Sequence, residues 1–167
     1  MTFHKLLKWL TAFVVIGAGA AAFYFFATPT FSNDYKQLTA RVEMGMKYTD
    51  PAEETIYFQP YIENPNPSSN ITLTHSADFM SIAVLDEHGN VMEDSVTVKE
   101  NNNDRAAGSL QTILHPGEQE ENINYYKVHL PDEAQRLQVT FTGQVKDEFG
   151  IDMVDESIEI NLNRLTM

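Results

Sequence analysis

Two stretches of this sequence alternate apolar and polar residues without a break, at residues 38–48 and 137–146. A period of two is typical of a β-strand that has one face in the protein core and the other in water. The second stretch runs into Asp147-Glu148-Phe149-Gly150, which has the composition of a turn, and apolar residues resume at Ile151. The sequence therefore predicts a β-hairpin in this region.

Shorter apolar segments fill the rest of the chain after residue 34, and turn-forming residues such as Asn64-Pro65-Asn66-Pro67 separate them. No long window in this part repeats apolar residues at the helical period. We expect further strands near residues 55–62, 71–74, 79–85, 96–98, 110–114, 123–130 and 157–163. Because two stacked sheets bury each other's apolar faces, this spacing favours an all-β fold, an antiparallel immunoglobulin-like β-sandwich of seven to nine strands.

The N-terminal region has a different composition. Lys5 and Lys8 precede a segment from Trp9 to Asn33 that contains no charged residue. As a helix, such a run is long enough to cross a hydrocarbon core roughly 30 Å thick, and the positive-inside rule places the preceding lysines in the cytoplasm. We therefore expect a single-pass protein of the cell membrane that contacts membrane lipid through this helix. Its parts are a short cytoplasmic tail at 1–8, a transmembrane helix or uncleaved signal anchor at 9–28, a linker at 29–36 and an extracytoplasmic β-sandwich at 37–164.

A cleaved signal peptide is the alternative for the same segment. Lys5 and Lys8 would form its charged region, and the small residues between Ala18 and Ala22 would supply the cleavage site. Cleavage there would leave the aromatic run 23–26 exposed at the start of the mature chain, whereas a retained helix would place these rings at the membrane interface. We therefore favour the anchor.

Two small residues in the expected membrane segment, Gly17 and Ala21, are four positions apart. This spacing lets two transmembrane helices approach closely, so both are candidates for helix–helix packing.

Charge and cysteine content exclude several classes of function. The chain contains 11 Lys and Arg against 24 Asp and Glu, which gives a formal net charge of −13, and it has no cysteine. All the acidic residues but only nine of the basic ones follow residue 33, so that part carries a formal charge of −15. Nucleic-acid binding relies on basic side chains, so we expect no nucleic-acid partner. Disulfides, thiolate metal sites and cysteine nucleophiles are excluded.

We expect no enzymatic activity, no cofactor and no metal site. The sequence has no nucleophile elbow, no Gly-rich phosphate loop and no zinc-protease motif. The four histidines of the expected sandwich lie far apart in the sequence, which favours solvated side chains over a metal site: His75, His88, His115 and His129. A hydrolase whose residues meet only in space would need at least two of them to converge with a carboxylate.

Two groups of metal-ligand residues have simpler explanations. Met44 and Met46 could bind Cu(I), but both lie on the apolar face of an expected strand, where core packing accounts for them. The acidic residues between Asp147 and Glu156 could bind calcium, but they lack a helix-flanked loop, so a solvated acidic surface is the better interpretation.

Aromatic residues gather in two expected strands. Tyr57 and Tyr61 lie in one, and Tyr125 and Tyr126 lie in the other. Aromatic side chains on an exposed sheet face are common anchors for a protein partner, so these four tyrosines are the candidate partner-binding residues.

The turns carry a resemblance to known sandwich proteins. The strand 57–62 that runs into Glu63-Asn64-Pro65-Asn66-Pro67, the turn 86–90 and the segment 114–118 are similar to those of membrane-anchored immunoglobulin-like modules. Through Asn-Pro-Asn the chain also resembles the type-2 late-embryogenesis-abundant sandwiches. The resemblance spans roughly residues 36–163 and implies a binding or accessory module without catalytic residues.

These features together predict a non-enzymatic, membrane-anchored binding module. We expect it to act through its sandwich as an accessory or assembly subunit of a membrane complex, with membrane or extracytoplasmic proteins as partners. A sheet edge can accept a partner strand through main-chain hydrogen bonds. The alternative is a secreted or periplasmic protein, released by signal-peptide cleavage, that binds a soluble ligand or metal.

Overall fold

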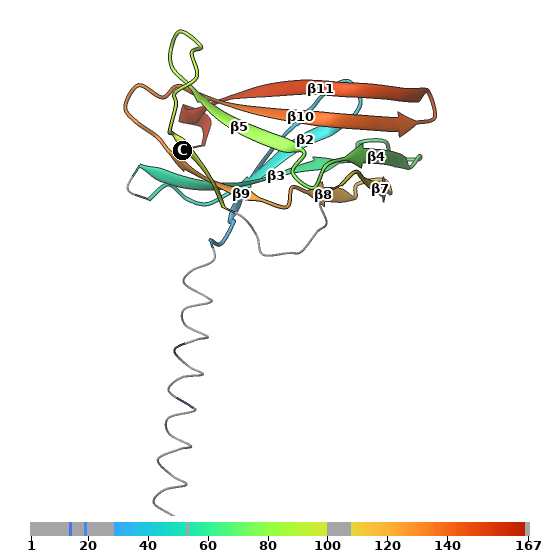
Figure 1. The fold of residues 1–167 in the computed structure, drawn as a ribbon, viewed down its shortest axis with the longest axis horizontal. Coiled ribbons are helices and arrows are strands. Elements are labelled where there is room, and N and C mark those ends of the chain that lie inside the picture. The colour runs from blue at the N-terminus through green and yellow to red at the C-terminus, as the bar shows by residue number, and fades with distance from the viewer. Residues whose placement is uncertain (1–13, 15–18, 20–28, 53, 100–107, 166–167) are drawn as a thin grey trace, which may run out of the picture. The chain divides into compact units, whose positions relative to one another are not determined.

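The structure is a computed structural model that describes residues 14, 19, 29–52, 54–99 and 108–165. The chain divides into two compact units, Met1–Thr30 and Phe31–Met167. Every described strand lies in the second unit, whose ribbon forms two layers (Figure 1).

Most of the predicted N-terminal features fall outside the described residues. The tail at 1–8 is not described, nor are Gly17 and Ala21, and only Val14 and Gly19 represent the segment 9–28. Among the residues that are described, no helix is long and apolar enough to cross a membrane.

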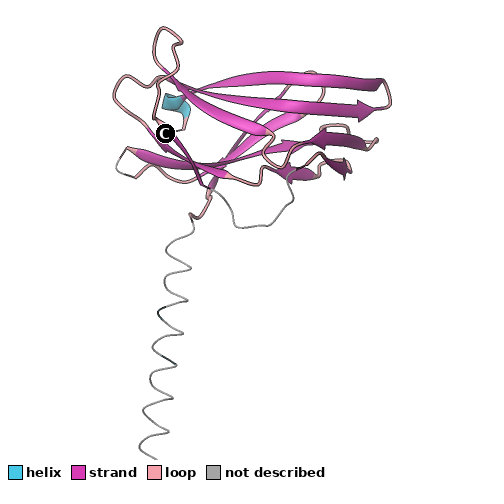
Figure 2. Cartoon of the chain, viewed as in Figure 1, coloured by secondary structure: helices cyan, strands magenta, loops and turns pink. Residues whose placement is uncertain are grey.

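The described part of the second unit contains eleven strands and one short 3₁₀ helix (Figure 2). Their bounds are β1 (Asn33–Leu38), β2 (Glu43–Tyr48), β3 (Thr55–Glu63), β4 (Ile71–His75), β5 (Met80–Leu85), β6 (Val96–Lys99), β7 (Leu110–Leu114), β8 (Gln119–Glu121), β9 (Tyr125–His129), β10 (Arg136–Asp147), β11 (Gly150–Asn161) and η1 (Leu162–Arg164).

Two antiparallel sheets make up the sandwich. The first sheet has the order β1-β2-β3-β9-β6, with β8 also paired to β3. The second has the order β11-β10-β4-β7, with β5 also paired to β10. Each sheet thus has a long central strand, β3 or β10, that pairs with one strand on one side and with two shorter strands in succession on the other.

The core lies between the sheets and follows the period-two pattern of the strands. On β10, Leu137, Val139 and Phe141 are fully buried, while the residues between them are only partly buried. Met44 and Met46 of β2 face the same core and are also fully buried. Burial of apolar side chains at about 25 cal/mol per Å² is the main force that holds the two layers together.

The prediction of an antiparallel β-sandwich is confirmed, but the number of strands is higher than seven to nine. Residues 38–48 form no single strand: β1 ends at Leu38, and a turn follows in which Thr39 donates its backbone N–H to the carbonyl of Val42 at 2.9 Å. The additional strands are β1, which is separate from β2, and β8, which has only three residues and no alternation that could have predicted it. The sheet also begins at Asn33, within the segment 29–36 expected to be a linker.

Candidate functional site

A groove of about 650 Å³ lies beside the turn that joins β10 to β11. Four separate parts of the chain line it: the end of β1 with the turn after it, the loop from β3 to β4, the start of β4, and the β10–β11 turn itself. We define the end groove by its lining residues Leu38, Ala40, Arg41, Pro65, Asn66, Pro67, Ile71, Asp147, Glu148 and Phe149.

The loop between β3 and β4 forms one wall, and asparagine side chains hold its shape. Asn64 is buried, and its amide nitrogen donates to the carbonyls of Ser69 and Leu114 at 2.9 and 3.0 Å. Asn66 accepts the backbone N–H groups of Ser68 and Ser69, each at 3.0 Å. Short amide side chains that bond the backbone a few residues away stabilise turns. The Asn-Pro-Asn-Pro motif therefore builds a fixed wall of the groove.

The β10–β11 turn forms another part of the wall. Asp147 accepts the backbone N–H of Phe149 at 2.7 Å and that of Gly150 at 3.1 Å through Oδ1. Gly150 has a φ of 142°, a conformation that residues with a Cβ rarely adopt. Glu148 accepts hydrogen bonds from Asn66 and from Ser69 at 3.4 and 3.1 Å, so this turn is also joined to the loop between β3 and β4.

Arg41 connects the two sheets at the edge of the groove. Its guanidinium forms ion pairs with Asp147 through Nη1 and with Asp152 through Nη2. The hydrogen bond from Arg41 lowers the pKa of Asp147 below its usual range, and the N–H groups of Phe149 and Gly150 act in the same direction. At the rim of the groove, the charges of Arg41, Asp147 and Asp152 are therefore paired with one another.

Large apolar side chains surround this end of the domain without being covered. Phe149 is 80% exposed and Met153 73%, and Leu38 and Ile151 are 63% and 56% exposed. Single exposed apolar residues are common on protein surfaces, but several at one end of a domain, of which Leu38 and Phe149 line a groove, are typical of an interaction site. Phe149 also occupies a turn, where polar residues and glycine are usual.

Two of the four predicted tyrosines are partly accessible. Tyr57 and Tyr125 lie on adjacent strands with ring centroids 6.2 Å apart, and Phe31 lies 6.3 Å from Tyr125 in an edge-on arrangement. All three side chains are half-buried.

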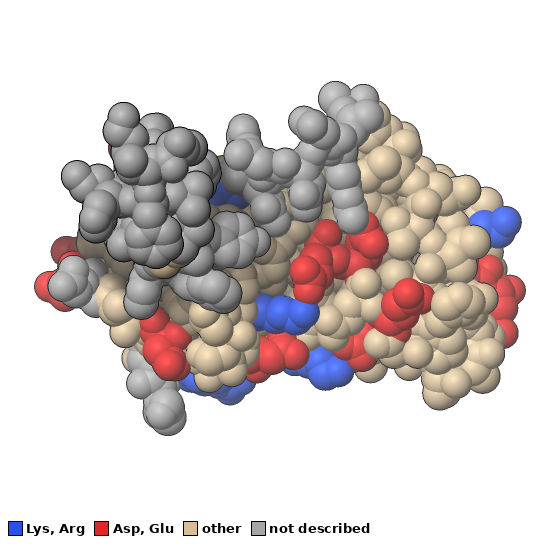
Figure 3. Space-filling view, turned by 90° about the horizontal axis from the view of Figure 1, so that it is seen from below, with Lys and Arg blue, Asp and Glu red and all other residues tan. Residues whose placement is uncertain are grey.

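Tyr61 is fully buried, although it lies on the outer face of the first sheet. Its ring covers Gly45 so closely that a Cβ at that position would lie 2.0 Å from the ring. Its hydroxyl donates to Asp34 at 2.8 Å, and burial with the nearby carboxylate raises the pKa of Tyr61. Ion pairs surround the ring, including Lys36 with Glu43 at 3.1 Å. On the part of this face that is not drawn in grey, acidic and basic side chains lie close to one another (Figure 3).

Tyr126 is buried at the opposite face of the same sheet and belongs to a network that joins the sheets. Its hydroxyl donates to Asp78 at 3.0 Å and lies 3.3 Å from the amide nitrogen of Asn122, and burial raises its pKa. Asn122 in turn accepts the backbone N–H groups of Phe79 and Met80. Neither Tyr61 nor Tyr126 presents a side chain to a partner in this structure.

The histidines are dispersed in the structure. His88, His115 and His129 are exposed, whereas His75 is buried and stacks edge-on against Phe79 with ring centroids 4.3 Å apart. Within the described ranges, no three His, Asp or Glu side chains come close enough to hold a metal ion.

Sequence reasoning missed the end groove. Leu38 belongs to the apolar side of an apparent strand and Phe149 to a turn, and nothing in the sequence brings the two together. The unusual phenylalanine in the turn was the one signal that could have indicated this site. Arg41 gave no signal, because its ionic partners lie more than a hundred positions away.

Comparison with known proteins gives only a distant likeness. Neither the scan of protein-family models nor the search of curated proteins finds a match. Among solved structures, the yeast GGA1 GAE domain is similar with 8% identity and a TM-score of 0.43, covering 77% of this chain and 97% of that one. The GAE domain of GGA2p from Saccharomyces cerevisiae gives 10% identity and a TM-score of 0.40, with 77% and 96% covered.

Proposed function

We propose that this protein is a non-enzymatic, membrane-anchored binding module that acts as an accessory or assembly subunit of a membrane complex. The observation that carries the proposal is the set of exposed apolar side chains at this end of the domain: Leu38 and Phe149 line the end groove, and Ile151 and Met153 lie on β11 next to the turn. Covering such a group with a partner removes apolar surface from water, which is the main favourable term in protein association.

The polar groups of the groove support binding rather than chemistry. Arg41 is engaged by two carboxylates, and Asp147 is engaged by Arg41 and by two backbone N–H groups. A general base or nucleophile needs an atom directed at a substrate, whereas these atoms are directed at one another. They hold the walls of the groove in place, and a preformed surface loses less entropy when a partner binds.

Anchoring is inferred from the N-terminal composition. The uncharged segment from Trp9 to Asn33 is long enough for a membrane helix, and the lysines that precede it favour an extracytoplasmic sandwich. To test this, the mass of the intact protein would be measured in membrane and soluble fractions of the producing cells. We expect the full-length mass in the membrane fraction. A soluble species that begins near Phe23 would overturn the anchor and favour the released form.

The binding site can be tested by photo-crosslinking in the same membranes. A photoreactive phenylalanine analogue would replace Phe149, and a matched variant would carry it at His88, which is also exposed but lies in the loop after β5. We expect a discrete adduct with a second protein from position 149 only, and its loss when Leu38→Lys is added. Equal adducts from both positions, or none from 149, would contradict a binding role for the groove.

A further inference from the structure

We infer that the free edge of β11 binds an extended, basic segment of a partner protein by adding it to the second sheet as a further strand. This inference rests on the proposed binding function and specifies the partner's chemistry. Three observations carry it: a long unpaired edge, apolar side chains beside that edge, and carboxylates along the same strand.

The edge of β11 is the longest free edge among the described strands. β11 pairs with β10 along its entire length from Gly150 to Asn161, and no described strand pairs with its other side. The turn between β10 and β11 contains two residues, so Asp147 and Gly150 form a hydrogen-bonded pair at the start of the ladder. From there, hydrogen-bonded and non-hydrogen-bonded pairs alternate along the two strands. Ile151, Met153 and Asp155 therefore direct their N–H and C=O groups to the free side.

Long free edges are normally protected in folded proteins by charged side chains, proline, bulges or a covering segment, and of these devices β11 has carboxylates, which repel another acidic strand but not a basic one. The sequence of β11 contains neither lysine nor proline, and its register with β10 runs without a bulge. Its backbone groups are therefore available for strand addition, a common means of peptide recognition.

Apolar side chains lie beside the part of β11 that is nearest the end groove. Ile151 and Met153 face outward from the second sheet, and Phe149 lies in the turn just before them. A strand added next to them would place alternate side chains on the same face. Apolar residues at those positions of the partner would cover Ile151 and Met153.

The charges of β11 select a basic partner. Two of its four carboxylates already have cationic partners, because Asp152 pairs with Arg41 and Glu159 pairs with Arg136. Asp155 receives only a hydroxyl hydrogen bond from Thr142 at 3.2 Å. One oxygen of Glu156 is buried, and no described group donates a hydrogen bond to it. Among the described residues, no cation therefore pairs with these two carboxylates near the middle of the strand.

The same charges disfavour a second copy of this chain as the occupant. Pairing two β11 edges would bring their carboxylates together, and the part of the chain after residue 33 carries a formal charge of −15. Like charges on adjacent strands are destabilising. A lysine- or arginine-bearing strand would instead place opposite charges across the new ladder.

The test uses the full-length protein in detergent and a fluorescent synthetic peptide with alternating valine and threonine in one half and consecutive lysines in the other. Valines at alternate positions can cover Ile151 and Met153, while consecutive lysines can reach both Asp155 and Glu156, which face opposite sides of the sheet. Binding would be measured by fluorescence anisotropy. The decisive control is the same peptide with N-methyl groups on alternate amides, which keeps charge and side chains but removes the N–H donors needed for strand addition. We expect the methylated peptide to bind about tenfold more weakly. Equal binding of the two peptides would overturn the inference, because it would indicate general electrostatic attraction.

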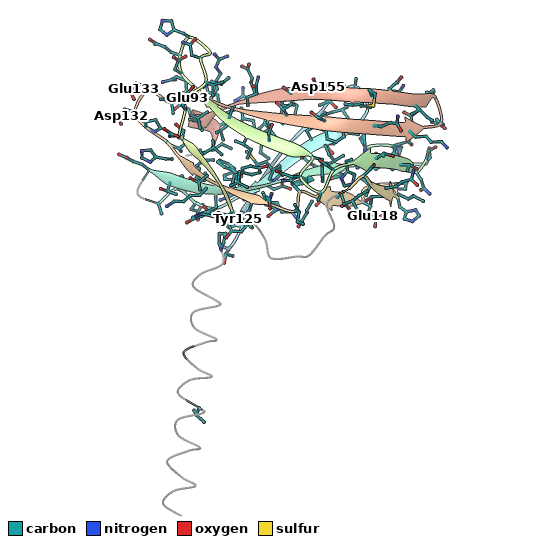
Figure 4. All side chains as sticks on the ribbon, viewed as in Figure 1. Glu93, Glu118, Tyr125, Asp132, Glu133 and Asp155 are labelled. Atoms are coloured by element: carbon teal, nitrogen blue, oxygen red, sulfur yellow. The ribbon has the colours of Figure 1, made fainter. Side chains whose placement is uncertain are left out.

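A matched pair of protein variants locates the site. Asp155→Lys changes the charge on β11, and Asp132→Lys makes the same change at the end of the domain away from the β10–β11 turn (Figure 4). We expect Asp155→Lys to weaken binding of the unmethylated peptide about tenfold and Asp132→Lys to change it less than about twofold. Equal loss in both variants would contradict binding at β11.

The outcomes distinguish this inference from the proposed function. If neither peptide binds while crosslinking through position 149 remains specific, the partner occupies the groove without adding a basic strand, and only the inference fails. If position 149 gives no specific adduct and the peptide does not bind, both fail.

Discussion

The side chain of Asn122 bonds backbone groups on both sides of the core near Tyr126. Its Oδ1 accepts the N–H groups of Phe79 and Met80 at 2.9 and 3.1 Å, and its Nδ2 donates to Asp78 at 2.7 Å. All of these atoms lie in or beside the core, where a polar group without a partner is costly. The geometry explains how a buried amide is accommodated at this position.

The Asn122→Ala substitution is expected to lower the free energy of unfolding by about 2–4 kcal/mol, because it leaves two buried backbone N–H groups without acceptors. Urea denaturation would measure the change. Asn124→Ala is the matched control, since Asn124 contributes its backbone carbonyl to this network. We expect the control to change stability by less than about 0.5 kcal/mol. An equal effect of the two substitutions would show that the network is not what stabilises this region.

Glu156 is a residue at which stability and the inferred binding role conflict. A buried carboxylate oxygen without a donor destabilises the fold, so Glu156→Met is expected to raise the free energy of unfolding by about 1 kcal/mol. Thermal denaturation would measure it, with the exposed neighbour variant Asp155→Asn as control. A loss of stability in Glu156→Met would mean that the carboxylate has a favourable role in the fold itself.

At the scale of elements, the Arg41 contact holds the β1–β2 turn against the β10–β11 hairpin. Because the pKa of Asp147 is lowered in the folded state, ionised Asp147 stabilises the fold above its unfolded pKa, near 3.8. This contribution is lost as the pH falls below that value. In Arg41→Met the pKa of Asp147 is expected to move back toward its ordinary value, and less stability is lost on acidification.

Carboxyl NMR titration of Asp147 and denaturation at pH 7 and at pH 3 would check this prediction. Arg136→Met is the control, because Arg136 pairs with Glu159 near the other end of β11 and does not contact Asp147. A titration of Asp147 that is the same in Arg41→Met as in the unaltered protein would contradict the assigned cause of the shift.

Some of the strands, but not all, could be predicted from the sequence. The strand at 137–146 was recognised because its long alternation matches a real strand with one buried face. The alternation at 38–48 was misleading: Val42, Met44 and Met46 are buried, but Leu38 is exposed. Apolar residues continued the period through a turn, and local pattern does not distinguish an apolar residue that packs from one that stays exposed.

The end groove shows why the site was harder to predict than the fold. It brings together Leu38, the segment from Pro65 to Ile71 and Phe149, which are far apart in the sequence. Periodicity reports which face of an element is apolar, but proximity between such segments depends on sheet order and register. Tyr61 shows the same limit of local pattern, since it lies on an outer face and is nevertheless covered by its neighbours, whereas Tyr57 and Tyr125 stay partly accessible.

At the scale of the whole molecule, we expect the acidic surface to keep copies of the sandwich apart. The free edge of β11 is long enough to pair with another β11, and its carboxylates oppose this. The double substitution Asp155→Asn with Glu156→Gln removes two of these charges. It is expected to increase self-association of the full-length protein roughly tenfold at low ionic strength, where repulsion is least screened.

Sedimentation velocity in detergent would measure that association. The matched control removes the same number of charges at the other end of the domain, through Asp132→Asn with Glu133→Gln (Figure 4). If net charge alone keeps the molecules apart, both double variants will associate to the same extent. If the position of the charges on β11 matters, only the first will do so, and adding Met153→Lys to it will restore the monomer, because a lysine on a free edge opposes strand pairing.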